Sequence, residues 1–432
     1  MKRFFLLIWA VVVVATSIQA QSIARETFEK DLRISANNYQ AYPDKNLPTL
    51  TPAPKGYTPF FINHYGRHGS RWLIDPKDYS IPVEQLSKGE INGKLTQRGK
   101  EVLAACRNML EASRQRLGEL SDIGAEQHQG IARRMVENFP EVWQGDAHVD
   151  GRSTVVIRCI LSMLNETDML KSLNPRLRIT TDASEHDMYY MNYRDSVAIA
   201  AQRAARPAVN EFKDKLFPPK ELDKRLGKIT SRLFTDKKFV RDSIDSFTLV
   251  MRLFDVVSNM QSHHDFENID LYTGVFTADD ATLIWTYNNA RWYVYSGNTP
   301  LTNHTGPLAH RHLLLNFVEA ADIAIASGTN SATLRFGHES VVLPTVCLMG
   351  LNGMDYETTQ LETLAEHWRS YEVFPMAANI QMVYYRKPGS DDILVKILLN
   401  EHEATLPIAT DVAPYYHWTD VRKHFLSRIG HL

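Results

Sequence analysis

The sequence predicts an α/β domain that is interrupted by a mainly α-helical insertion. Helix and strand patterns alternate along residues 21–192 and again along 285–432, which is typical of an α/β fold. Between these segments, residues 193–284 contain almost no glycine and repeat Lys, Arg, Ala and Leu with helical spacing. We therefore expect one α/β domain built from two segments of the chain, with a helical domain inserted at 193–284.

The first 20 residues form a separate segment. Lys2 and Arg3 precede an apolar run at 4–15 that is shorter than a membrane span, and the small residue Ala20 ends the segment. This pattern is typical of a secretory signal peptide over residues 1–20, with a retained membrane anchor as the alternative. We expect a periplasmic or secreted protein that is not inserted in a membrane once the signal is cleaved.

Composition excludes several classes of function. The 432 residues carry a formal net charge of −2, and losing the two positive charges of Lys2 and Arg3 makes it −4. Such a chain has no overall attraction for nucleic acid or anionic membranes, so an anionic substrate must be held by local charge. Three cysteines are too few for a disulfide scaffold and are not spaced as a zinc site. His263-His264-Asp265 favours a loop over a metal site, because adjacent side chains rarely converge on one ion.

The elements of the first α/β segment follow from local patterns. Residues 22–57 predict an irregular lead-in, and the apolar run at 59–63 predicts the first strand. A helical pattern then opens at Thr96, a plausible N-cap, and reaches Leu117. A second helix with a similar polar start is expected to end near Asn138.

The rest of the α/β part alternates in the same way. Residues 148–154 predict a short strand and turn, and 155–170 a helix with Arg158 in its first turn. An anion at this helix start would meet free backbone amides as well as the arginine. The remaining expected elements are a strand at 176–181, a helix at 309–326, and strands at 332–336, 380–385 and 393–399.

The stretch Arg67-His68-Gly69-Ser70-Arg71 follows the first strand and carries an imidazole between two guanidiniums. Arginine stays charged and offers planar, forked donors that match phosphate or carboxylate oxygens. The histidine could attack an oxyanion held there, and Gly66 and Gly69 would let the backbone turn sharply. The alternative is a solvated basic turn.

The expected strand at 332–336 also ends in a loop, Gly337-His338-Glu339-Ser340. If both strands belong to one sheet, their carboxyl ends open into the same crevice, where α/β folds bind ligands. His338 and Glu339 would then face the His68 stretch. Taken alone, His338 is more typical of a structural histidine.

These residues together resemble the two-domain branch of the histidine phosphatases, which contains acid phosphatases and phytases. The resemblance is closest to the multiple inositol polyphosphate phosphatases, and it extends over most of the chain after residue 55. It rests on residues 67–71, on Arg158 in 152–158, on His338 followed by an acid, and on the stretches 184–190, 334–338 and 414–421. The resemblance implies a phosphoglycerate-mutase-like α/β domain with the inserted helical domain.

The resemblance also implies a role for each site residue, with no metal and no cofactor. His68 would be the nucleophile that accepts a phosphoryl group, and Arg67, Arg71, Arg158 and His338 the phosphate-binding residues. The leaving alcohol needs a proton, and Glu339 is the candidate proton donor. Arg194 is a further candidate for substrate contact. One departure concerns the acid: this chain has His338-Glu339-Ser340 where the subgroup usually has His-Ala-Glu and the wider branch His-Asp.

The function expected from the resemblance is hydrolysis of inositol polyphosphates, including phytate, through a phosphohistidine. The alternatives are a broad acid phosphatase for sugar or nucleotide monoesters, and a binder of phosphorylated ligands without turnover. Basic residues of 193–284, among them Lys224, Lys228 and Lys237, could cradle a polyanion. They are interleaved with acids, which favours an ordinary solvated face.

Overall fold

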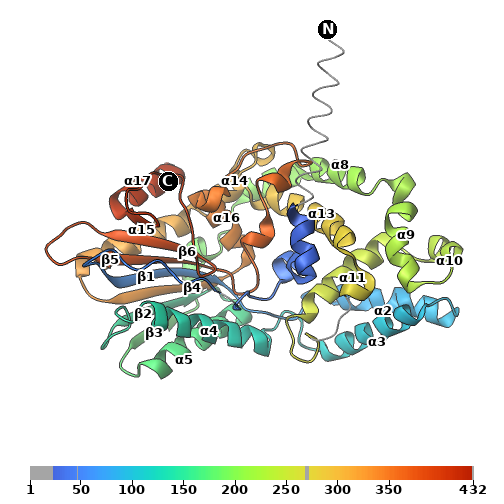
Figure 1. The fold of residues 1–432 in the computed structure, drawn as a ribbon, viewed down its shortest axis with the longest axis horizontal. Coiled ribbons are helices and arrows are strands. Elements are labelled where there is room, and N and C mark those ends of the chain that lie inside the picture. Colours follow the sequence, from blue (N-terminus) through green and yellow to red (C-terminus); the bar gives the residue numbers. More distant parts are fainter. Residues whose placement is uncertain (1–22, 46, 268–271, 431–432) are drawn as a thin grey trace, which may run out of the picture.

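The computed structural model describes residues 23–45, 47–267 and 272–430 (Figure 1). The expected signal peptide at 1–20 lies outside these residues. Within the described ranges, no helix is both long and apolar enough to cross a membrane.

One mixed sheet forms the centre of the α/β part, in the order β3-β2-β4-β1-β5-β6-β7, with β8 also paired to β6. Strands β3, β2, β4 and β1 are parallel, and β5, β6, β7 and β8 add antiparallel pairs. The strands are β1 (Thr58–Arg67), β2 (His148–Ser153), β3 (Arg178–Asp182), β4 (Ser331–Gly337), β5 (Asn379–Arg386), β6 (Leu394–Leu399), β7 (His402–Glu403) and β8 (Tyr415–His417). The predicted α/β class is confirmed.

Helices cover both faces of this sheet, which is why nine of the ten residues of β1 are buried. Phe61 packs into the cluster under α15, α16 and α17, whereas Ile62 packs into the opposite cluster with α4 and α5. Alternate residues of a strand point to opposite faces, so the two layers follow from the apolar run itself. The bounds are α4 (Asp122–Asn138), α5 (Ile157–Leu173), α15 (Arg311–Ser327), α16 (Glu339–Met349) and α17 (Trp418–Ile429).

A helical part lies beside the sheet, at the right of Figure 1. Its core joins residues of α9, α11 and α13 to residues of α2 and α3, which precede the expected insertion in the chain. Conversely, buried residues of α8 belong to the cluster of the sheet. The bounds are α2 (Pro76–Ile91), α3 (Gln97–Ala112), α7 (Ser196–Ala204), α8 (Arg206–Leu216), α9 (Leu222–Leu233), α10 (Lys237–Ser243), α11 (Ser246–Met260) and α13 (Ala278–Ser296). The boundary expected at residue 284 falls inside α13, so the division at 193–284 stays a prediction.

Several expected elements are observed with small shifts. Thr96 caps α3 by accepting the Gly99 amide at 2.9 Å, but the helix ends at Ala112 rather than at Leu117. The expected helix to Asn138 is α4, and Arg158 is the second residue of α5. Residues 263–265 lie in a turn, as expected. Short helices complete the chain: α6 (Met188–Met191), α12 (Tyr272–Val275), α14 (Thr305–Leu308) and several 3-10 turns.

The lead-in at 22–57 is more ordered than expected. Residues 23–30 are helical, and a 3-10 helix, η1 (Leu32–Tyr39), follows after Asp31, whose side chain accepts the Arg33 amide. η1 packs against α11 and α13. Its sequence lacks sustained periodicity, so this order comes from tertiary packing, and it brings the end of η1 to the carboxyl end of β1.

Candidate active site

The His68 loop, residues 67–71, leaves the carboxyl end of β1 between two other segments. Parallel pairing sets Arg67 opposite Gly337, so β1 and β4 end side by side. The His68 amide donates to the Gly337 carbonyl at 2.9 Å, and the His68 carbonyl accepts the Ala377 amide at 3.0 Å. The expectation that both loops open at the same edge of one sheet is therefore confirmed.

The two glycines of this stretch are needed for space rather than for turning. Neither Gly66 nor Gly69 has a positive φ, which corrects the expectation of a sharp glycine turn. A Cβ on Gly66 would lie 2.7 Å from Cε1 of His64, and one on Gly69 would lie 2.6 Å from Cα of Gly124. Real Cβ atoms do not approach so closely, so the loop packs directly on the start of α4 because position 69 has no side chain.

His68 is fully buried and held in one tautomer. Its Nδ1 lies 2.9 Å from the Gly69 carbonyl oxygen, which can only accept, so Nδ1 carries the proton. Nε2 therefore keeps its lone pair, and it has no hydrogen-bond partner in the structure. Burial, reinforced by Arg67 and Arg71, holds the pKa of His68 well below its ordinary value. The ring is neutral, with a free nitrogen facing Glu339.

Arg67 is anchored along one edge of its guanidinium. Its Nη1 donates to the carbonyls of Asn38 at 2.7 Å and Phe374 at 3.0 Å. Its Nε lies 3.1 Å from Oε2 of Glu339, while Nη2 is buried without a partner. Burial lowers the pKa of Arg67 to about 10, so the group stays charged at neutral and acidic pH.

Arg71 and Arg158 add two more cations to the same region. Arg71 is 3% exposed, donates to the Trp72 carbonyl at 2.8 Å and lies over the Tyr39 ring. Arg158 is in the first turn of α5, where Val156 provides no side-chain cap. Burial and the nearby Arg71 lower the pKa of Arg158, which shows that like charges are held together here.

His338 and Glu339 begin α16 and face the His68 loop. The His68 and His338 rings are 5.8 Å apart, and Nε2 of His338 lies 3.3 Å from Oγ1 of Thr154. Burial lowers the pKa of His338 to about 4, with Arg158 adding to the effect, so the ring is neutral above that pH. Oε2 of Glu339 lies 3.6 Å from Nε2 of His68. Although burial opposes its ionisation, the charges of Arg67 and Arg71 hold the pKa of Glu339 well below its ordinary value.

The electrostatics of this cluster favour an anion. Arg67 contacts the Glu339 carboxylate, the charges of Arg71 and Arg158 also act on it, and buried nitrogens of all three arginines have no hydrogen-bond partner in the structure. Buried donors are normally satisfied, and each unsatisfied one costs roughly 1–3 kcal/mol. The uncapped starts of α5 and α16 add positive potential. This part of the protein therefore favours an oxyanion over a cation.

Three side chains of the same cluster are of residue types that bind metal ions. His68, His338 and Glu339 each offer a ligand atom, and these atoms lie within 4.8 Å of one another. Zinc prefers such nitrogen and oxygen ligands, but three neighbouring guanidiniums would repel a cation. The residues therefore suit an anion better than a metal, and the expected absence of a metal stays a prediction.

Sequence reasoning missed the residues that hold the loop. Gln127 on α4 accepts the Ser70 amide at 2.9 Å, and Ser162 on α5 accepts the Gly69 amide at 3.1 Å. One turn later, Glu166 is fully buried, with Oε2 2.8 Å from Nδ1 of His128. Arg158, Ser162 and Glu166 recur every four residues and so lie on one face of α5. That spacing was visible in the sequence.

Arg194, the candidate substrate contact, is not brought into this cluster. It is exposed in the segment between α6 and α7. Within the described part of the chain, no hydrogen bond or ion pair joins its side chain to the residues of the His68 loop. A role for Arg194 stays a prediction.

Solved structures of phosphatases share this fold. The multiple inositol polyphosphate phosphatase of Bifidobacterium longum, in complex with inositol hexasulfate, aligns with a TM-score of 0.75 and 17% identity, over 92% of this chain and 98% of that chain. The phytase from D. castellii aligns with a TM-score of 0.68 and 13% identity, over 92% and 85%. The apo Hafnia alvei phytase aligns at 0.52 and 11%, over 88% and 98%.

No family model matches the sequence, and no curated protein matches it. At these identities the likeness is one of fold. The chain thus has the α/β fold with a helical insertion that is found in phytases. More particularly, the predicted resemblance to the multiple inositol polyphosphate phosphatases is confirmed at the level of fold.

Proposed function

We propose that this protein is a phosphomonoesterase that hydrolyses inositol polyphosphates, including phytate, through a phosphohistidine on His68. The observation that carries the proposal is the free Nε2 of a neutral, buried histidine that faces unpaired buried arginine donors. A nucleophile beside an oxyanion site is the arrangement that phosphoryl transfer requires. The fold shared with inositol polyphosphate phosphatases and phytases supports the same class of reaction.

In the first step, Nε2 of His68 forms a bond to phosphorus while the bond from phosphorus to the alcohol oxygen breaks. The leaving alcohol takes a proton from Glu339. Arg67, Arg71 and Arg158 hold the non-bridging oxygens, so positive charge is already in place where negative charge develops. In the second step, water gives its proton to the Glu339 carboxylate and attacks phosphorus, which frees His68 and releases phosphate.

The role of Glu339 depends on its response to the substrate. In the ligand-free protein, Glu339 is ionised and lies against Arg67, 3.1 Å from Nε. A bound phosphate places further negative charge among the same cations and competes for Arg67. Nearby negative charge raises the pKa of a carboxyl group, so Glu339 would gain the proton it donates when substrate binds.

Two experiments test this proposal. One traps the phosphorylated protein and compares the wild type with His68→Ala, and the other follows the products formed from inositol hexakisphosphate. Acid quenching is avoided, and denatured protein is probed for acid-labile, alkali-stable phosphate after brief turnover. We expect protein-bound phosphate on the wild-type chain and none on His68→Ala. We also expect inositol hexakisphosphate to lose its phosphates one at a time. Absence of a histidine-linked phosphate under conditions that release phosphate would refute the covalent route.

Two alternatives are separated by simple comparisons. A broad acid phosphatase would turn over glucose 1-phosphate and aryl phosphate faster than inositol hexakisphosphate. A binder without turnover would retain phosphorylated ligands and release no phosphate. The intact combination of nucleophile and acid favours an enzyme, because a binder needs neither.

The place of action is also a proposal. The expected signal peptide at 1–20 indicates a periplasmic or secreted enzyme. Determining the N-terminus of the purified protein tests this, with Gln21 expected first.

A further inference from the structure

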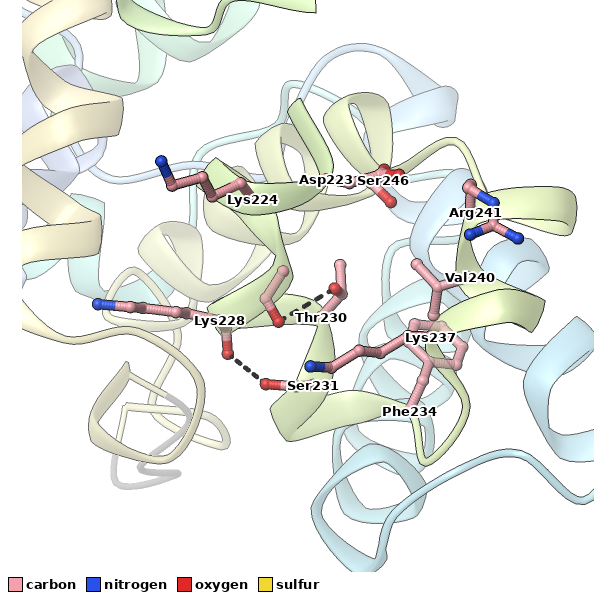
Figure 2. Close-up of a pocket in the computed structure, with 11 residues that line it drawn as sticks. Asp223, Lys224, Lys228, Thr230, Ser231, Phe234, Lys237, Val240, Arg241 and Ser246 are labelled. Carbon is pink, nitrogen blue, oxygen red and sulfur yellow. Dashed lines mark hydrogen bonds between the residues drawn. The ribbon is translucent and has the colours of Figure 1, made fainter. Parts of the chain in front are cut away.

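A cavity of about 460 Å³ lies in the helical part between α9 and α10 (Figure 2). Small-molecule sites span roughly 300–1,000 Å³, so the volume suits a compact ligand. α9 and α10 lie at the end of the molecule away from the sheet (Figure 1), which separates this cavity from the His68 loop. Nothing in the proposed reaction uses it.

The lining of this cavity is strongly basic. Lys224 and Lys228 come from α9, and Lys237 and Arg241 come from α10 (Figure 2). The one acid in the lining is Asp223, so four cations and one acid give a formal charge of +3. Figure 2 shows Lys237 extended from α10 toward α9, whereas Lys224 and Lys228 extend away from α10, so Lys237 is the cation that reaches across the cavity.

Two of these cations are not neutralised by a neighbour. Lys224 lies 3.8 Å from the carboxylate of Glu221, and Arg241 lies 3.2 Å from that of Asp242. For Lys228 no ion pair is found among residues 23–45, 47–267 and 272–430, and the same holds for Lys237. Acids in the sequence therefore pair with two of the four cations, and among the described residues Lys228 and Lys237 keep an unpaired charge.

Gly227 provides a second, independent observation. It is in the middle of α9, where glycine costs a helix about 1 kcal/mol relative to alanine. A Cβ at position 227 would meet nothing within 4 Å, so packing does not require glycine. Gly227 lines the cavity, and any side chain there would project into open space. The missing side chain keeps the cavity open at the expense of helix stability.

Part of the cavity lining is apolar. Phe234 and Val240, which are 3% and 7% exposed, belong to it. The hydroxyls of Thr230 and Ser231 donate to carbonyls of their own helix, and their oxygens stay able to accept. A ligand that suits this mixed lining has both a carbon body and anionic groups.

We propose that this cavity, the α9–α10 site, binds a small organic polyanion, a compact carbon body with two or more phosphate or sulfate groups. The site is separate from the His68 loop and does not rest on the proposed reaction. At this one position we thus propose a binding site in place of the ordinary solvated face that the sequence favoured.

The test counts binding sites on the full chain by titration calorimetry with inositol hexakissulfate, whose sulfate esters are not phosphoryl donors. We expect Gly227→Leu, which places a bulky side chain in the cavity without changing charge, to remove one binding event relative to the wild type. Lys228→Ala/Lys237→Ala should weaken the same event at least about tenfold, or about 1.4 kcal/mol. Both lysines are exposed, so this variant serves if Gly227→Leu does not fold.

Lys238→Ala is the matched control, because Lys238 is exposed on α10 beside Lys237 but does not line the cavity. It should keep the wild-type count. A count unchanged in folded Gly227→Leu, or an equal loss in Lys238→Ala, would overturn the proposal in favour of general surface attraction. If the His68 loop does not bind inositol hexakissulfate, the wild-type count falls by one, but the difference between wild type and Gly227→Leu remains.

Discussion

Replacing Glu339 by glutamine should separate two effects that the structure combines in one side chain. Glu339→Gln keeps the shape but removes both the proton and the negative charge. Oε2 of Glu339 lies 3.1 Å from Nε of Arg67 and 3.6 Å from Nε2 of His68, in the space that a transferred phosphoryl group must enter. The carboxylate therefore competes with phosphate for Arg67 until it is protonated.

The two effects have opposite signs. General acid catalysis contributes roughly 10²–10⁴-fold, so kcat for inositol phosphates should fall by about that factor. An aryl phosphate releases a stabilised phenolate and should lose less than about tenfold. Two unit charges 4 Å apart interact by about 4 kcal/mol at an effective dielectric constant of 20, which sets an upper limit for the repulsion removed. Inorganic phosphate should bind at least about tenfold more tightly to the variant, or about 1.4 kcal/mol.

Steady-state kinetics with inositol hexakisphosphate and 4-nitrophenyl phosphate, with phosphate as competitive inhibitor, measures all three quantities. Glu339→Asp is the control, because it keeps a carboxyl group on a side chain one methylene shorter. We expect it to retain part of the inositol phosphate activity. Equal losses on both substrates, together with unchanged phosphate inhibition, would show that Glu339 is neither the proton donor nor a competitor for Arg67.

Three further outcomes are expected. Gly69→Ala forces the loop off Gly124, and a displacement near 1 Å can cost about 100-fold, so kcat/KM should fall by at least that much with little loss of binding at the α9–α10 site. His338 has a pKa of about 4, and a bound dianion raises it; sulfate affinity should therefore increase as pH falls from 7 and level off below about 4, with a smaller slope in His338→Asn. Glu166→Gln weakens the buried contact with His128 and should lower the free energy of unfolding by about 1–3 kcal/mol in urea titrations; an unchanged midpoint would contradict this.

Local patterns were sufficient for most regular elements. Thr96 and the polar start of the next segment predicted two helices, and the structure has Thr96 and Ser121 as their N-caps. Apolar runs predicted β1, β4, β5 and β6. The signals were local because caps and alternating side chains depend on residues only a few positions apart.

Order in the lead-in could not be predicted in this way. η1 has no strong pattern of its own, yet Asn38 and Tyr39 contact Arg67 and Arg71. The Phe374 carbonyl, more than 300 residues further along the chain, accepts from the same Arg67. Contacts at such separations leave no periodic trace in one sequence.

The sequence by itself determined the α/β class, the helical composition of the middle of the chain and the residue types of the site. His68, Arg158 and His338 could be chosen because strand and helix ends are local features. Tertiary structure alone decided the tautomer of His68, the ionised state of Glu339 and the grouping of three guanidiniums. It also decided that Gly69 is needed for close packing rather than for turning. These properties depend on burial and on distances between segments far apart in the chain, and electrostatic energy changes steeply with both.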